Sequence, residues 1–213
     1  MAAPRYYSQL NQDRTIAEVL LPGKTDGWFV EAGAHDGVNF SNTKALEDLG
    51  WKGLCVEAMP ETFKELCKNR TCHCEQYALY DQSGVVLDFT VESTVSGLMS
   101  GITKHLNGPH FKYVINKTVI PVTTSTLTDL LDKNQAPNVI DYFSLDVEGA
   151  EQKVLEGIDW DKYTFSVINV EHNFEEPDRS NIRSYLEARG YKFYKQEQWD
   201  DWYTGPNFTP PQV

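Results

Sequence analysis

The chain has 213 residues, of which 40% are hydrophobic and 12% aromatic, so it can bury a full-sized core as one globular domain. Its net charge of −12 and its lack of a basic stripe with interleaved aromatic residues argue against nucleic acid as a substrate. It has no apolar run near the roughly 20 residues of a membrane span and no visible signal peptide, which makes it cytoplasmic as it stands, with the secretory lumen open if an N-terminal anchor has been removed.

The first predicted element is a short amphipathic helix over residues 6–20, within a helical lead-in that covers 1–22. Its polar side chains include Gln9, Gln12 and Asp13. These three either face a ligand or form a cap and a solvated face, and the pattern alone does not decide between the two.

A glycine-rich turn follows the first predicted strand, residues 28–30. Glu31, Gly33 and Gly37 form the pattern E-x-G-x-x-x-G, and a helix is predicted over 41–49 with one of its first two residues as cap. Strand, glycine-rich turn and helix make up the first unit of a nucleotide-type site at the carboxyl edge of a parallel sheet. The pattern is not the dinucleotide fingerprint G-x-G-x-x-G.

The next two strands supply further candidates for this site. The second is predicted over residues 53–57, and its last residue, Glu57, is placed to accept hydrogen bonds from the ribose hydroxyls of an adenosine ligand. The third, over 72–77, brings Tyr77 and Ala78 over the crevice where the adenine would lie. The tyrosine ring either stacks on the base or packs into the core.

The middle of the chain is predicted to hold a lid. A strand over 85–91 is followed by an irregular stretch over 92–117, and a strand returns over 118–123. An irregular stretch of this length is typically a functional lid or a disordered loop. We predict that its glycine-flanked part, 96–101, covers the acceptor, the second substrate that would lie beside the adenosine ligand.

Strands and helices also alternate in the second half of the chain. This alternation predicts one α/β domain over 1–213, with a doubly wound, mostly parallel sheet that has helices on both faces. The elements expected there are a helix beginning at 126, a strand over 140–147, a helix over 149–157, a strand over 165–170, a helix over 177–189, an antiparallel pair over 191–194 and 199–203, and a loose tail over 205–213.

Several acids gather where the fourth and fifth parallel strands end. Asp146 and Glu171 lie at these neighbouring strand ends, Glu148 begins the next helix, and His172 follows Glu171. Converging carboxylates repel one another unless a cation or protons intervene. Asp146, Glu171 and His172 could hold Mg²⁺ or Mn²⁺, which would lower the pKa of an acceptor hydroxyl, and Glu148 is a candidate base. Alternatively the acids cap a helix and His172 is a surface histidine.

The chain resembles the FkbM family of class I S-adenosylmethionine-dependent methyltransferases, over nearly its whole length. The most specific segment is 145–151. Two departures from the family pattern are Asn11, where glycine is usual, and His172, where asparagine is frequent. The segments that carry the resemblance are SQLNQD (8–13), FVEAGAHDG (29–37), SNT (41–43), GWKG (50–53), VEAMP (56–60), KNR (68–70), ALYD (78–81), LDVEGAE (145–151) and VEHN (170–173).

The resemblance implies seven strands with an antiparallel last pair, and S-adenosylmethionine as the cofactor. It implies methyl transfer to a hydroxyl of a sugar, a glycan or a glycosylated natural product. A metal-free methyltransferase of a small alcohol, and a non-catalytic binding module that retains the fold, are the alternatives. The cofactor contacts expected are Gly33, Ala34 and Gly37 at the methionine part with Glu31 and Asp36 nearby, Ser41 at its carboxylate, Glu57 at the ribose, Tyr77 and Ala78 around the adenine, and Ala58, next to Glu57 in the chain.

The acid cluster is similar in position to that of metal-dependent catechol and macrolide-sugar O-methyltransferases. Those enzymes place a basic residue three positions after the first acid, where this chain has Gly149. We therefore assign the catalytic roles to Asp146, Glu148 and His172. Trp199 and Trp202 either form a stacking wall for a sugar or pack in the core.

Four cysteines leave the redox state open. Cys55 lies in a predicted core strand, and the spacing of Cys67, Cys72 and Cys74 does not match a zinc site. A disulfide from Cys67 to Cys72 or Cys74 and a set of free thiols are both compatible with the sequence.

Overall fold

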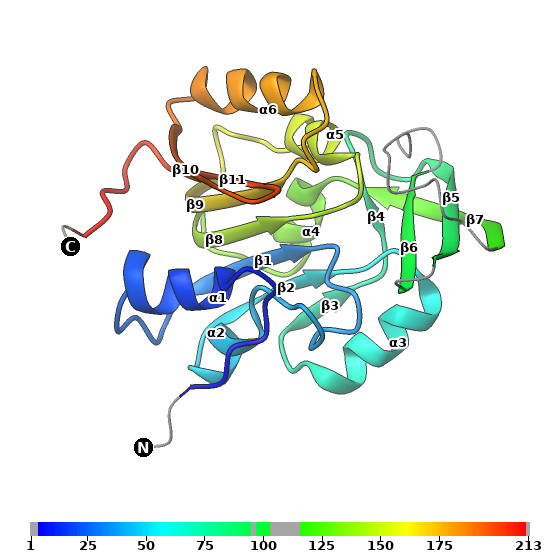
Figure 1. Ribbon diagram of the computed structural model, residues 1–213, viewed down its shortest axis with the longest axis horizontal. Coiled ribbons are helices and arrows are strands. Elements are labelled where there is room, and N and C mark those ends of the chain that lie inside the picture. The colour runs from blue at the N-terminus through cyan, green and yellow to red at the C-terminus, as the bar shows by residue number, and fades with distance from the viewer. Residues whose placement is uncertain (1–3, 95–96, 103–115, 212–213) are drawn as a thin grey trace.

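The computed structural model describes residues 4–94, 97–102 and 116–211. Its main sheet has seven strands: β1 (Trp28–Ala32), β2 (Lys52–Val56), β3 (His73–Glu75), β8 (Val139–Leu145), β9 (Thr164–Glu171), β10 (Lys192–Glu197) and β11 (Asp200–Thr204). Their order is β10-β11-β9-β8-β1-β2-β3 (Figure 1). The strands from β9 to β3 run parallel, and β11 is antiparallel to both β9 and β10. The predicted doubly wound sheet with an antiparallel last pair is confirmed.

Both faces of this sheet are buried. Successive side chains of a strand point to opposite faces, so each strand contributes to two cores. Phe29 of β1 packs in one core with Leu66, and the next residue, Val30, packs in the other with Leu130. Helices cover both faces (Figure 1). They are α1 (Gln12–Arg14), the π-helical turn η1 (Thr15–Leu20), α2 (Lys44–Asp48) and α3 (Pro60–Asn69) on the first face, and α4 (Leu127–Lys133), α5 (Glu151–Glu156) and α6 (Asp178–Glu187) on the second.

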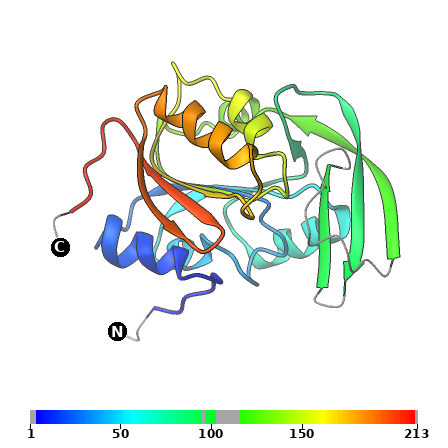
Figure 2. The ribbon, with the colours of Figure 1, turned by 45° about the horizontal axis from the view of Figure 1, so that its top comes forward.

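A second sheet corrects the prediction of an irregular stretch over 92–117. It consists of β4 (Ala78–Leu79), β7 (Asn116–Ser125), β5 (Val86–Thr94) and β6 (Gly97–Ile102), in that order. Figures 1 and 2 show it beside the main sheet. Strand β6 pairs antiparallel with β5, and this pairing overrides the weak strand propensity of its glycines and serines. The rest of the expected lid, 95–96 and 103–115, lies outside the described residues.

Two helices begin three or more residues later than predicted. The first starts at Gln12 instead of residue 6, because the chain before it is extended and Ser8 forms a β-bridge with Phe40. The second starts at Lys44 instead of residue 41. Its N-cap is Thr43 and not one of the two predicted residues, although the hydroxyl of Ser41 accepts the N–H of Lys44 at 3.0 Å.

The start of the first helix is fixed by Asp13, which is fully buried. Its carboxylate accepts the N–H of Tyr7 at 2.6 Å and the hydroxyl of Ser8 at 2.6 Å. Asn11 has a φ of 59°, a left-handed backbone that asparagine tolerates better than most residues. Asp13 is therefore a structural anchor for the lead-in segment. Within the described ranges, no helix has both the length and the apolar composition needed to cross a bilayer.

Candidate functional site

A pocket of about 490 Å³ opens at the carboxyl ends of β1, β2, β8 and β9. It brings together acids from all four strand ends. Asp36, Gly37 and His172, which the sequence also proposed for the site, are not among the residues that line it. The proposed residues that do line it are Glu31, Gly33, Ala34, Ser41, Glu57, Ala58, Tyr77, Ala78, Asp146, Glu148 and Glu171.

The turn from β1 to α2 is built around the carboxylate of Glu31. This side chain is buried, and one of its oxygens accepts the hydroxyls of Ser41 at 2.9 Å and Thr43 at 2.6 Å. The other oxygen accepts the N–H of Asn42 at 2.6 Å. Arg70, from the end of α3, adds a guanidinium nitrogen 3.1 Å away. Glu31 thus holds the turn in place, and its protein partners already use both oxygens.

The two motif glycines are required by packing. A Cβ on Gly33 would lie 1.7 Å from the carbonyl oxygen of Asp146, so glycine allows the end of β1 to approach the end of β8. A Cβ on Gly37 would lie 2.6 Å from Leu66, and the backbone there has a φ of +78°. Gly33 faces the pocket as well, whereas Gly37 packs against α3. The structure thus shows a packing reason for glycine at position 37, and its contact with a cofactor stays a prediction.

Asp36 also belongs to the turn instead of the pocket. Its carboxylate accepts the N–H groups of Val38 at 2.9 Å and Asn39 at 2.8 Å. An aspartate that bonds the backbone two residues ahead closes a turn on its own. The sequence pattern could not separate this local role from a contact with the cofactor, because both need an acid at this position.

Glu57 joins the tip of β2 to the same turn. Its carboxylate accepts the N–H of His35 at 2.9 Å and the N–H of Met59 at 2.8 Å, and only 7% of the residue is exposed. Burial raises the pKa of Glu57 to about 7, against the opposing effect of these backbone hydrogen bonds. A carboxylate has about four lone-pair positions, and with a further backbone bond from Ala58 about one remains for a ribose hydroxyl.

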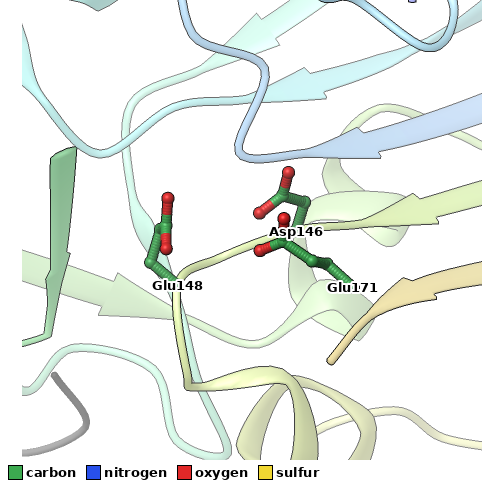
Figure 3. Close-up of side chains that lie close together, drawn as sticks. All are labelled: Asp146, Glu148 and Glu171. Atoms are coloured by element: carbon green, nitrogen blue, oxygen red, sulfur yellow. The ribbon is translucent and has the colours of Figure 1, made fainter. Parts of the chain in front are cut away.

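Asp146, Glu148 and Glu171 converge beside the pocket (Figure 3). Each offers one oxygen, and these three atoms all lie within 4.8 Å of one another. Burial raises the pKa of Asp146 to about 6 and that of Glu148 to about 8, and the pKa of Glu171 lies well above its ordinary value. Without a cation the cluster must therefore hold protons near neutral pH.

These raised pKa values predict that stability increases as the pH falls. Ordinary values of 3.8 for Asp146 and 4.5 for Glu57 and Glu148 apply in the unfolded chain. A carboxyl whose folded pKa is raised stabilises the fold below its unfolded pKa, and this contribution is lost as the pH rises through the folded pKa. We expect the free energy of unfolding of the ligand-free protein to rise by at least about 1 kcal/mol between about pH 8 and about pH 5.

Urea denaturation at several pH values in this window measures that dependence. Glu148→Gln removes one of the titrating groups and should flatten the curve. A stability that is constant, or that increases with pH, would contradict the assignment of protons to these buried acids.

The structure corrects the position of His172. Its Nδ1 accepts the N–H of Phe174 at 3.0 Å, and its Nε2 lies 3.4 Å from the carboxylate of Asp201. The side chain is buried there and is not part of the acid cluster. It follows Glu171 in the chain, so its side chain leaves the backbone on the opposite side. Among the described residues, the acids whose oxygens come together are Asp146, Glu148 and Glu171.

The sequence did not identify one acid of the pocket, Asp200. Asp200 of β11 accepts the side-chain amides of Gln12 at 2.9 Å and Asn169 at 2.8 Å, and all three residues line the pocket. Burial raises the pKa of Asp200. The available signal was the pair of acids between Trp199 and Trp202 in an otherwise apolar strand. Trp199 lines the pocket, whereas Trp202 is fully buried.

The charge of the pocket suits a cationic ligand. Among the described residues, six carboxyl side chains line it and no lysine or arginine does, although Glu31 pairs with Arg70 behind the lining. S-Adenosylmethionine carries a sulfonium and an ammonium group, both of which such a lining attracts. The cluster of Asp146, Glu148 and Glu171 offers oxygen ligands only, the donor set that Mg²⁺ and Mn²⁺ prefer. The residues present fit both groups.

The sequence of residues 31–193 matches the family model described as the methyltransferase FkbM domain. No curated protein matches the chain in sequence. Among solved structures, the chain is similar to M. capricolum TrmK in complex with S-adenosyl-homocysteine, with 11% identity, a TM-score of 0.49, and 97% of this chain and 70% of that chain covered.

Two further solved structures are similar at the same level. A precorrin-6y C5,15-methyltransferase from Geobacter metallireducens has 10% identity, a TM-score of 0.44, and coverage of 85% and 80% of the two chains. The Methanococcus jannaschii fibrillarin pre-rRNA processing protein has 13% identity, a TM-score of 0.45, and coverage of 93% and 74%. These TM-scores are too low to carry the assignment, which rests on the family match over more than half of the chain. The chain belongs to the FkbM methyltransferase domain family and is an S-adenosylmethionine-dependent methyltransferase.

Proposed function

We propose that this methyltransferase methylates a hydroxyl oxygen of a sugar, a glycan or a glycosylated natural product, with the help of a divalent cation. The observation that carries the proposal is the convergence of Asp146, Glu148 and Glu171 beside the pocket. A sugar hydroxyl is a poor nucleophile near neutral pH, so a base or a metal must help to remove its proton. The sulfonium of S-adenosylmethionine supplies the electrophilic methyl group.

The residues of the turn and of β2 are assigned to the cofactor. Gly33 and Ala34 are proposed to lie against its methionine part, and Glu57 to bind the ribose. Tyr77 and Ala78 are proposed to flank the adenine. Glu31 and Ser41 bond to each other, so we assign them to hold the turn that the cofactor meets.

The acid cluster is assigned to the acceptor. Asp146 and Glu171 are proposed to hold Mg²⁺ or Mn²⁺, with Glu148 as a third ligand or as the base. A pKa of about 8 suits Glu148 to the role of base, because a proton acceptor works best when its pKa lies near the working pH. Asn39 and Asn169 also line the pocket, and amides and carboxylates together suit a polyhydroxyl acceptor.

Transfer of a labelled methyl group to a panel of acceptors tests the proposal. The panel contains neutral monosaccharides, glycans and small alcohols, with a nucleic acid and a protein lysine as other classes. Label in a sugar ether would support it. Label in an amine or in a base of the nucleic acid, with none in any hydroxyl, would contradict it.

Removal of metal is expected to slow the reaction by roughly 100-fold, since Lewis-acid activation contributes several kcal/mol. The measurement is turnover after treatment with a chelator, followed by addition of Mn²⁺ or Mg²⁺. Recovery on addition supports the cation. Undiminished turnover after complete removal would instead assign deprotonation to Glu148 or Asp146 alone.

A further inference from the structure

Three cysteines lie beside the turn that faces the cofactor. Cys55 is buried on β2, Cys72 is half-buried just before β3, and Cys74 lies on β3. The sulfur of Cys72 is 3.6 Å from the sulfur of Cys55, and the sulfur of Cys74 is 3.6 Å from the carbonyl oxygen of Cys72. Cys67, which the sequence offered as a disulfide partner, is exposed on α3. The sulfurs of Cys55 and Cys72 are therefore in contact.

Cys55 and Cys72 both lie next to the buried ion pair of Glu31 and Arg70, which holds the turn. The sulfur of Cys55 lies 3.8 Å from the carboxylate of Glu31. The N–H of Cys72 donates to Glu47 at 2.8 Å, and Glu47 also pairs with the guanidinium of Arg70. A change in the position of Cys72 must therefore displace the segment that carries Arg70.

The two thiols differ in reactivity. Hydrogen bonds with Cys55 and Cys74, and the positive charge of Arg70, lower the pKa of the Cys72 thiol. Burial raises the pKa of Cys55. Cys72 also retains access to solvent, whereas Cys55 has none. A thiolate with solvent access is the form that peroxides attack.

We propose that Cys55 and Cys72 form a reversible disulfide under oxidation by hydrogen peroxide, and that this bond weakens binding of S-adenosylmethionine. The sulfur of Cys72 attacks the peroxide, which leaves a sulfenic acid on Cys72 and releases one water. The sulfur of Cys55 then attacks the sulfur of Cys72, its proton leaves with the hydroxyl as a second water, and the disulfide forms. Two thiols are oxidised and one peroxide is reduced to two waters.

The bond requires movement close to the cofactor. A disulfide has sulfurs about 2.05 Å apart, so the pair must close by more than an ångström. The segment from Arg70 to Cys72 moves with it and disturbs the hydrogen bonds to Glu31 and Thr43 that hold the turn. Loss of one hydrogen bond to a charged group corresponds to roughly a tenfold change in affinity.

Peptide mapping and calorimetry on the full chain test this inference. After peroxide treatment we expect a peptide cross-linked between Cys55 and Cys72 and a dissociation constant for S-adenosylmethionine about tenfold higher, both reversed by dithiothreitol. Cys72→Ser should abolish both changes, and Cys67→Ser should leave both intact. The reduced protein serves as the reference for cofactor binding itself, so a failure of oxidation is distinct from a failure to bind.

Two outcomes would overturn the proposal. One is the absence of this cross-linked peptide after saturating oxidation, including the case in which Cys72 joins Cys74 instead. The other is a cross-link that forms in full without changing the affinity for the cofactor.

Discussion

Replacement of Asp146 by asparagine is expected to lower the rate of methyl transfer by about 10²–10⁴-fold, the usual contribution of a group that binds or deprotonates the nucleophile. Asp146 shares the acid cluster with Glu148 and Glu171, and burial has raised its pKa to about 6. Asparagine keeps the volume but removes the charge needed to hold a cation or a proton. The measurement is kcat with the acceptor identified in the panel, together with calorimetry of cofactor binding.

The matched control is Asp26→Asn, because the side chain of Asp26 is 91% exposed. This variant should keep turnover within about twofold. For Asp146→Asn, the affinity for S-adenosylmethionine should change much less than kcat. If a folded Asp146→Asn enzyme kept ordinary turnover, the reaction would not depend on this cluster.

Replacement of Arg70 by methionine is expected to destabilise the protein by about 3–5 kcal/mol, the cost of leaving a buried charge without its partner. The side chain of Arg70 is fully buried, and its guanidinium contacts the carboxylates of Glu31 and Glu47, which are 5% and 8% exposed. Methionine retains the apolar length of the side chain and leaves Glu31 without a cation, whereas Glu47 keeps only Lys44, at 3.8 Å. Urea denaturation measures the loss.

An exposed ion pair gives the comparison. Arg14 and Glu18 pair at 2.8 Å, with side chains 57% and 44% exposed. Arg14→Met should cost no more than about 0.5 kcal/mol, as expected for an exposed pair one helical turn apart. If Arg70→Met lowered the free energy of unfolding by no more than this, the buried ion pairs of Arg70 would contribute little to the stability of the fold.

The sequence predicted the architecture well because strand ends and turns are local features. Glu57, Asp146 and Glu171 each end a buried strand, and the parallel order of these strands is sufficient to bring them to one edge. The ends of the helices were predicted less accurately than the strands. The start of the first one depends on a β-bridge between Ser8 and Phe40, which sequence patterns do not show.

The partners of the site residues were the part that could not be predicted. Arg70 reaches Glu31 from 39 positions away in the chain, and the sequence placed it in no role. His172 follows Glu171 but faces the other way, toward Asp201. Such contacts are fixed by the packing of α3 against the main sheet and by the pairing of β11 with β9 within it, and not by local pattern.

The bond between Gln12 and Asp200 connects residues that are 188 positions apart. Both lie outside the span 31–193 that defines the family, yet both contribute walls to the cavity. A protein trimmed to that span would lose most of the central strand β1 and all of β11, and with them this wall of the cavity and much of the main sheet. A shortened version of this enzyme should therefore retain at least the residues from about 8 to 204.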